Sequence, residues 1–158
     1  MDYTKQLGKI AFGTRLRLLT DKFLQDANKI YKYKNIEFEP RWFVMFSLLH
    51  KRSPLSITEL TAELGFTQPA VTQIANILVE KKLVKVIKHK TDTRVKLLAL
   101  TPKALQLYDD LKPVWEGFNS AINELFAETG YDVLQVIGNI ETALEKKDMF
   151  TRVKEKLK

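Results

Sequence analysis

The side chains whose types and spacing favour a specific chemistry lie within residues 67–80. They carry amide or hydroxyl groups at helical spacing, and they are Gln68, Thr72, Gln73 and Asn76. Such groups donate and accept hydrogen bonds, as contacts to base edges or phosphates in the DNA major groove require. This face has no acidic residue before Glu80, whereas a merely solvated helix more commonly carries Glu and Lys. The pattern favours a groove-binding helix, with Pro69 in its first turn as a further contact.

A strongly basic segment follows this helix. Between Lys81 and Lys96 there are seven lysines and arginines and one acidic residue, Asp92, in a chain whose net charge is +7. A solvated charged face would explain the composition, but the neighbouring polar helix favours contacts to phosphates. We expect Lys88, Lys90 and Arg94 to bind DNA.

Composition argues against an enzyme. The 158 residues include no cysteine and two histidines, which exclude thiolate chemistry and leave little for a zinc site or a histidine-based triad. The paired carboxylates Asp109 and Asp110 are adjacent, so on a helix they point in different directions. The sequence also contains no glycine-rich phosphate loop and no nucleophile elbow. We therefore expect no enzymatic activity, no metal and no cofactor.

Length and hydropathy predict one globular domain. Hydrophobic residues make up 45% of the chain, enough for a proper core at this length. The sequence has neither an apolar run of the roughly 20 residues that a membrane helix needs nor a signal-peptide pattern at its start. The expected location is therefore the cytoplasm, without membrane association.

Local signals place the polar face on the second helix of a helix-turn-helix. Ser56-Ile57-Thr58-Glu59 has the form of a capping box, and Gly65 suits the end of the helix that it opens. Thr67 suits the N-cap of the next helix, which is expected to run to about Lys82. The turn between these two short amphipathic helices has the size that the motif requires.

The rest of the chain reads as a β-hairpin flanked by long helices. The apolar period changes to two over residues 83–88 and 95–100, which predicts two strands joined by a polar, basic turn. Helices are predicted over residues 5–33, 41–50, 102–129 and 133–144, and the charged tail is expected to fray. The fold class is mainly α with a small β-hairpin wing: a winged helix-turn-helix with N- and C-terminal dimerisation helices.

The chain resembles the MarR family of transcriptional regulators over nearly its whole length. The resemblance rests on the segments Ser56-Ile57-Thr58-Glu59-Leu60 to Gly65, Val71-Thr72-Gln73, Leu78 to Val84, Asp92-Thr93-Arg94 and Leu100-Thr101. It implies that Arg94 enters the minor groove and that Asp92 supports the wing. Two positions depart from the family pattern: Lys82 stands where glycine is usual, and Thr61 where alanine is usual.

The resemblance also implies an obligate homodimer whose terminal helices intertwine. Residues 1–35 and 102–146 would then form the dimerisation helices, and residues 40–100 the DNA-binding lobe of a single MarR-like domain spanning 1–158. Apolar residues near both ends have too few partners in one small lobe, which supports this: Leu7, Ile10, Phe12, Phe118, Ile122, Phe126, Ile137 and Ile140. A dimer would recognise a palindromic operator in double-stranded DNA.

Members of the family often release DNA when a small aromatic ligand binds between the lobe and the dimerisation helices. The residues expected there are Phe12, Arg15, Trp42, Met45, Tyr108, Leu111 and Trp115. Aromatic rings with a nearby arginine would suit a planar anion. Such a cluster is more often plain core, however, so a regulator without a small-molecule effector remains an alternative.

Two further questions stay open from the sequence. The winged helix could instead bind protein, although a protein-binding wing would not need this much positive charge. The resemblance implies a repressor released by ligand, and the residues themselves leave activation open as an alternative.

Overall fold

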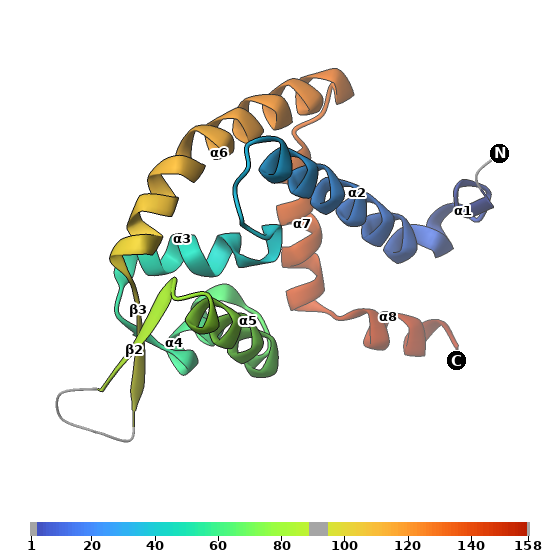
Figure 1. The fold of residues 1–158 in the computed structure, drawn as a ribbon. Helices are drawn as coiled ribbons and strands as arrows, with labels where there is room; N and C mark the ends of the chain where they lie inside the picture. The colour runs from blue at the N-terminus through green and yellow to red at the C-terminus, as the bar shows by residue number, and fades with distance from the viewer. Residues whose placement is uncertain (1–2, 89–94, 158) are drawn as a thin grey trace. The chain divides into compact units, whose positions relative to one another are not determined.

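The computed structural model describes residues 3–88 and 95–157. The described chain is mainly helical and carries one small antiparallel sheet (Figure 1). It divides into two compact units, residues 1–114 and 115–158, and the prediction of a single domain therefore stays a prediction. No helix in the described ranges is long and apolar enough to cross a membrane.

The N-terminal segment is three helical pieces rather than one helix. Helix α1 (Tyr3–Gln6) is followed by the 3-10 helix η1 (Gly8–Ala11) and by α2 (Phe12–Tyr33). Gly8 has a φ of +60°, a left-handed conformation that glycine adopts without steric cost and that cannot continue an α-helix. The prediction of one continuous helix over residues 5–33 was wrong at this point.

The helix-turn-helix forms as its capping signals predict. A short 3-10 helix, η2 (Pro40–Trp42), leads into α3 (Phe43–Arg52), which contacts α4 (Ile57–Leu64). Ser56 and Glu59 form the complete capping box, with Glu59 N donating to Ser56 Oγ at 3.2 Å and Ser56 N donating to Glu59 at 2.7 Å. Gly65 ends α4 at a φ of +65°, and the chain then enters α5 (Gln68–Glu80).

The sheet has three strands in the order β1-β3-β2. The predicted hairpin is confirmed as β2 (Val84–Lys88) and β3 (Lys96–Leu100), which pair from Val84 opposite Leu100 to Lys88 opposite Lys96. The sequence did not predict β1 (Leu55–Ser56), because two residues are too few to show a period. Leu55 pairs with Leu98, so β1 holds the start of α4 against strand β3 of the hairpin.

The core of the first unit lies between the helix-turn-helix, the sheet and the start of α6 (Pro102–Thr129). Its largest fully buried side chains are Trp42, Phe46, Met45, Leu49, Leu60, Leu78, Leu111 and Val71. The ring of Phe38 meets those of Tyr31, Trp42 and Phe46 edge-on, with centroids 5.3–5.5 Å apart. This is a preferred aromatic geometry, and it attaches the end of α2 to the lobe.

The C-terminal unit ends in two amphipathic helices. Asp148 caps α8 (Met149–Lys156) by accepting a hydrogen bond from Thr151 N at 2.8 Å, so the tail that was expected to fray is helical. In α7 (Val133–Lys146) every side chain is exposed or half-buried. Its exposed apolar residues are Leu134, Val136, Ile137, Ile140 and Leu144.

The two departures from the family pattern both have a structural consequence. Lys82 has a φ of +59°, a conformation that glycine adopts freely and that costs other residues roughly 1–2 kcal/mol. Within the described part of the chain, the buried hydroxyl of Thr61 has no hydrogen-bond partner. An alanine there would leave no polar group unsatisfied.

Candidate nucleic-acid interface

The polar face predicted on α5 is at the surface. Gln68, Pro69, Gln73 and Asn76 are exposed and Thr72 is half-buried, and these five residues together line a shallow hollow. The opposite face of α5 is buried through Val71, Ile74, Ala75 and Leu78. The apolar residues therefore anchor the helix in the lobe and leave the amides and the hydroxyl available to a ligand outside it.

Three local features determine where this polar face begins. Gly65 turns the chain in the left-handed region, and Thr67 has the extended backbone of an N-cap residue. The hydroxyl of Thr67 accepts a hydrogen bond from Ala70 N at 3.4 Å, while Pro69 occupies the first turn, where it forfeits no intrahelical bond. These features place Gln68 at the start of α5 and Gln73 in its second turn.

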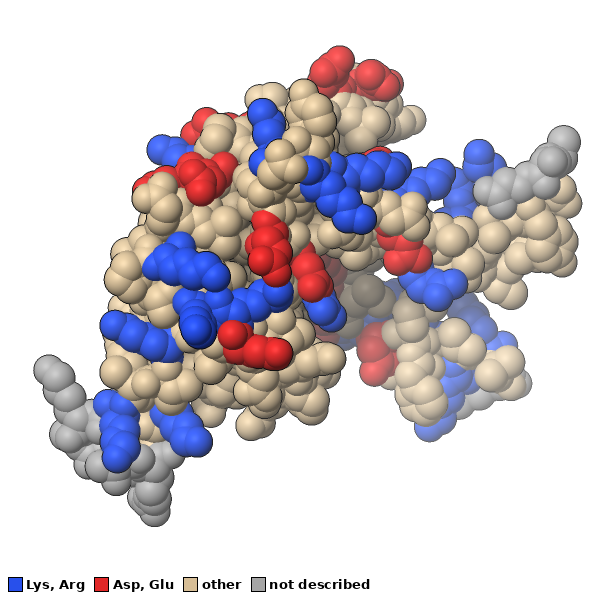
Figure 2. All heavy atoms as spheres, in the orientation of Figure 1, with Lys and Arg blue, Asp and Glu red and all other residues tan. Residues whose placement is uncertain are grey.

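The hairpin carries exposed positive charge next to this helix. Strand β2 contacts α5, and Lys85, Lys88 and Lys96 are all exposed; lysine side chains gather on the part of the surface where the two strands lie (Figure 2). Lys88 stands directly opposite Lys96, and like charges opposite each other destabilise a strand pair. A polyanion bound here would relieve that repulsion.

The structure describes part of the predicted wing. Lys90, Asp92 and Arg94 lie outside the described residues, so their roles stay predictions. The helix ends at Glu80, two residues earlier than predicted, and Lys81 forms its C-cap.

One lysine of the basic segment differs from the others. Lys81 forms an ion pair with Glu37, and its side chain is 33% exposed. The hydrogen bond and the charge of Lys81 hold the pKa of Glu37 below its usual range, and the same hydrogen bond raises the pKa of Lys81. Both groups are therefore ionised at neutral pH. No local pattern predicts this pair, because its members are 44 residues apart.

The role of the seven expected ligand residues stays a prediction, and their surroundings in the structure differ. Trp42, Met45 and Leu111 are fully buried in the core, and Trp115 belongs to the second unit. Tyr108 stacks on His50 with ring centroids 3.5 Å apart, a contact that the sequence did not predict.

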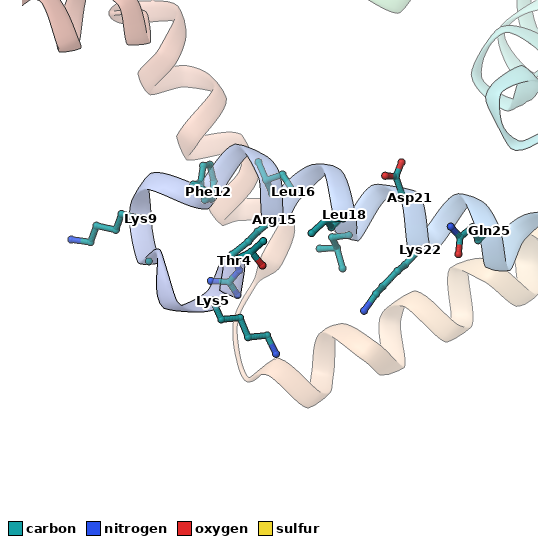
Figure 3. Close-up of a pocket in the computed structure, with 12 residues that line it drawn as sticks. Thr4, Lys5, Lys9, Phe12, Arg15, Leu16, Leu18, Asp21, Lys22 and Gln25 are labelled. Atoms are coloured by element: carbon teal, nitrogen blue, oxygen red, sulfur yellow. The ribbon is translucent and has the colours of Figure 1, made fainter. Parts of the chain in front are cut away.

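Phe12 and Arg15 line a different hollow, on the N-terminal helices. This N-terminal groove also includes Lys5, Leu16 and Lys22, and it runs along α1, η1 and the start of α2 (Figure 3). Its lining includes apolar side chains such as Phe12 and Leu16 and cationic side chains such as Arg15, and among the described residues that line it Asp21 is the one acidic residue.

The described residues offer no alternative metal chemistry. Among residues 3–88 and 95–157, no group of three or more histidine, aspartate or glutamate side chains is arranged to hold a metal ion.

Comparison with known structures shows what the fold is similar to. The fold is similar to a MarR/EmrR family regulator from Acinetobacter sp. ADP1 (TM-score 0.69, 21% identity, 85% of this chain and 94% of that chain). It is also similar to MepR of S. aureus, solved as a DNA complex (TM-score 0.70, 18% identity, 85% and 97% coverage). A third similar structure is BpsR of Bordetella bronchiseptica (TM-score 0.61, 18% identity, 86% and 92% coverage). These likenesses define a winged helix-turn-helix with long N- and C-terminal helices.

The sequence of the lobe is similar to one known family. Residues 38–95 match the family model of the MarR family, and among curated proteins none matches the chain in sequence. This match covers little more than a third of the 158 residues, and over that range the lobe resembles the MarR family.

Proposed function

We propose that this protein is a sequence-specific regulator that binds double-stranded DNA as a homodimer, with α5 in the major groove and the wing on the flanking backbone. The observation that carries the proposal is the exposed, acid-free face of α5, backed by a buried apolar face and flanked by a hairpin with opposed lysines. The fold neighbour from S. aureus was solved with DNA. Such a regulator would bind its DNA in the cytoplasm.

The dimer is proposed from the exposed apolar surface at both ends of the chain. In the first unit, Phe12, Leu16 and Leu19 are 47–53% exposed along the N-terminal groove. In the second unit, Ile137 and Leu144 lie on the apolar face of α7. Surfaces of this kind on a small protein mark an interaction site, and a second copy of the chain would bury both. Two α5 helices would then meet successive major grooves of one palindromic operator.

Ligand control is proposed for the N-terminal groove, where Phe12 offers a ring and Arg15 a guanidinium to a planar anion. BpsR is described as regulated in its DNA binding by 6-hydroxynicotinic acid. Repression released by such a ligand requires that the ligand bind the DNA-incompetent dimer more tightly than the DNA-bound one, because equal affinity shifts nothing. Trp42 and Met45 would remain core residues.

Binding to random-sequence duplex DNA should weaken steeply as salt rises. Each phosphate neutralised by a lysine or arginine contributes about −0.9 to the slope of log affinity against log salt concentration. With Lys85, Lys88 and Lys96 exposed on each of two wings, we expect a slope of about −5 or steeper. Fluorescence anisotropy at several salt concentrations measures it. A slope near zero would instead identify a protein-binding module.

The same titration tests the wing residue that the family resemblance singles out. Arg94→Ala should weaken operator binding and leave the thermal unfolding midpoint unchanged, since a wing-tip side chain contributes little to the core. Unchanged operator affinity in this variant would refute the role assigned to Arg94.

A further inference from the structure

The C-terminal end of α5 is held by side chains from two distant parts of the chain. Glu37 precedes η2, and Thr101 and Lys103 stand at the start of α6. Together with Lys81 they form a set of contacts that we call the α5 clamp. All four residues belong to the first unit.

Two members of the clamp bind the carbonyl groups that follow α5. Lys103 Nζ donates to the carbonyl oxygen of Lys81 at 3.2 Å, and Thr101 Oγ1 donates to that of Lys82 at 2.8 Å. Carbonyls at a helix C-terminus lack intrahelical partners, and a cation there also complements the helix dipole. These bonds fix the position of the end of α5 relative to the start of α6.

Lys81 completes the clamp from the other side. Its ammonium group pairs with the carboxylate of Glu37 and lies 5.7 Å from the ring centroid of Trp42, which is itself 1% exposed. A cation over a buried indole gains electrostatic attraction from the ring. Lys81 is therefore attached both to the core and to the segment that joins α2 to η2.

Lys81 thus differs from the described lysines of the hairpin. Lys85, Lys88 and Lys96 extend from the hairpin and are exposed, so their charges are available to a polyanion. Lys81 is already neutralised by Glu37 and would need to break that pair in order to reach a phosphate. All four residues have the same side chain, so the difference in their roles comes from the groups that surround each of them.

We propose that Lys81 and Glu37 are positioning residues that set the orientation of α5 for DNA, and that Lys81 makes no phosphate contact. This inference rests on the proposed DNA-binding function. It separates Lys85, Lys88 and Lys96, which would supply phosphate contacts, from Lys81, which would orient α5.

Salt dependence separates the two roles. Lys88→Gln and Lys96→Gln should each reduce the magnitude of the log–log salt slope by about 1.8 per dimer, because two phosphate contacts are lost. Lys81→Gln should leave the slope unchanged but lower operator affinity about fivefold or more, with a smaller loss on random DNA. A slope change for Lys81→Gln equal to that for Lys88→Gln would overturn the proposal.

Variants of Glu37 test the same proposal without removing the positive charge of Lys81. If Lys81 contacted phosphate, Glu37→Gln would release its charge and tighten binding; the clamp predicts weaker operator binding instead. The charge-swapped double variant Glu37→Lys with Lys81→Glu should recover most of the lost affinity, whereas a glutamate at a phosphate contact would weaken binding further. Tighter operator binding by Glu37→Gln contradicts the clamp. The clamp is also contradicted if the swapped variant unfolds at the wild-type temperature but does not recover operator affinity.

The wild-type protein distinguishes this inference from the function on which it rests. Wild-type binding with no dependence on salt overturns both the proposed function and the clamp. Steep wild-type dependence, together with a Lys81→Gln slope as shallow as that of Lys88→Gln, overturns the clamp alone.

Discussion

Replacing Gln73 with alanine is expected to relax the base preference at one position in each operator half-site. Gln73 is exposed on the acid-free face of α5, and a glutamine amide can pair with adenine through two hydrogen bonds. Losing one such pair should reduce discrimination by about 1–3 kcal/mol per half-site. Asn76→Ala should act in the same way at a different position. The measurement is competition binding with operators that vary at single base pairs.

The matched control is Gln135→Ala on α7, which removes the same amide from an exposed position far along the chain. It should leave base preference unchanged. If Gln73→Ala weakens all sequences by the same factor, Gln73 contacts phosphate rather than base edges. If it changes neither affinity nor preference, α5 does not read the operator.

Replacing Ile140 with aspartate should convert the dimer to a monomer and abolish operator binding. Ile140 is 38% exposed within the apolar face of α7, so the fold of a single chain contributes little to burying it. A carboxylate at a dimer interface would be desolvated without a partner, at a cost of several kcal/mol. Light scattering should report the chain mass of 18.3 kDa in place of about 37 kDa for a dimer.

Thr142→Asp is the matched control for this change. Thr142 is exposed, and at 100° per residue it falls on the side of α7 away from Ile137, Ile140 and Leu144. This variant should stay dimeric and bind DNA normally. A monomeric wild-type protein at micromolar concentration, or an Ile140→Asp variant that stays dimeric, would show that α7 does not form the interface.

Local signals in the sequence predicted much of the lobe because their causes are local. The capping box at Ser56, the left-handed turn at Gly65 and the N-cap at Thr67 each involve residues within a few positions of one another. The two long strands showed a clear period of two. The face of α5 could also be predicted, since its apolar and polar residues alternate at helical spacing.

What the sequence could not show depends on distant contacts or on very short elements. Gly8 interrupts the first helix through a backbone conformation that periodicity does not reveal, and β1 is two residues long. The pair between Glu37 and Lys81 joins segments far apart in the chain. Helical periodicity likewise could not separate the buried Trp42 and Met45 from residues that line a hollow, such as Phe12.

Selection of binding sites from random duplex DNA by the wild-type protein tests the central claim most directly. The claim is that two α5 helices of a homodimer read one operator. Selection should enrich an inverted repeat whose half-site centres lie about one helical turn apart, roughly 34–36 Å. Recovery of no preferred sequence, or of a single unrepeated site bound by one chain, would contradict it.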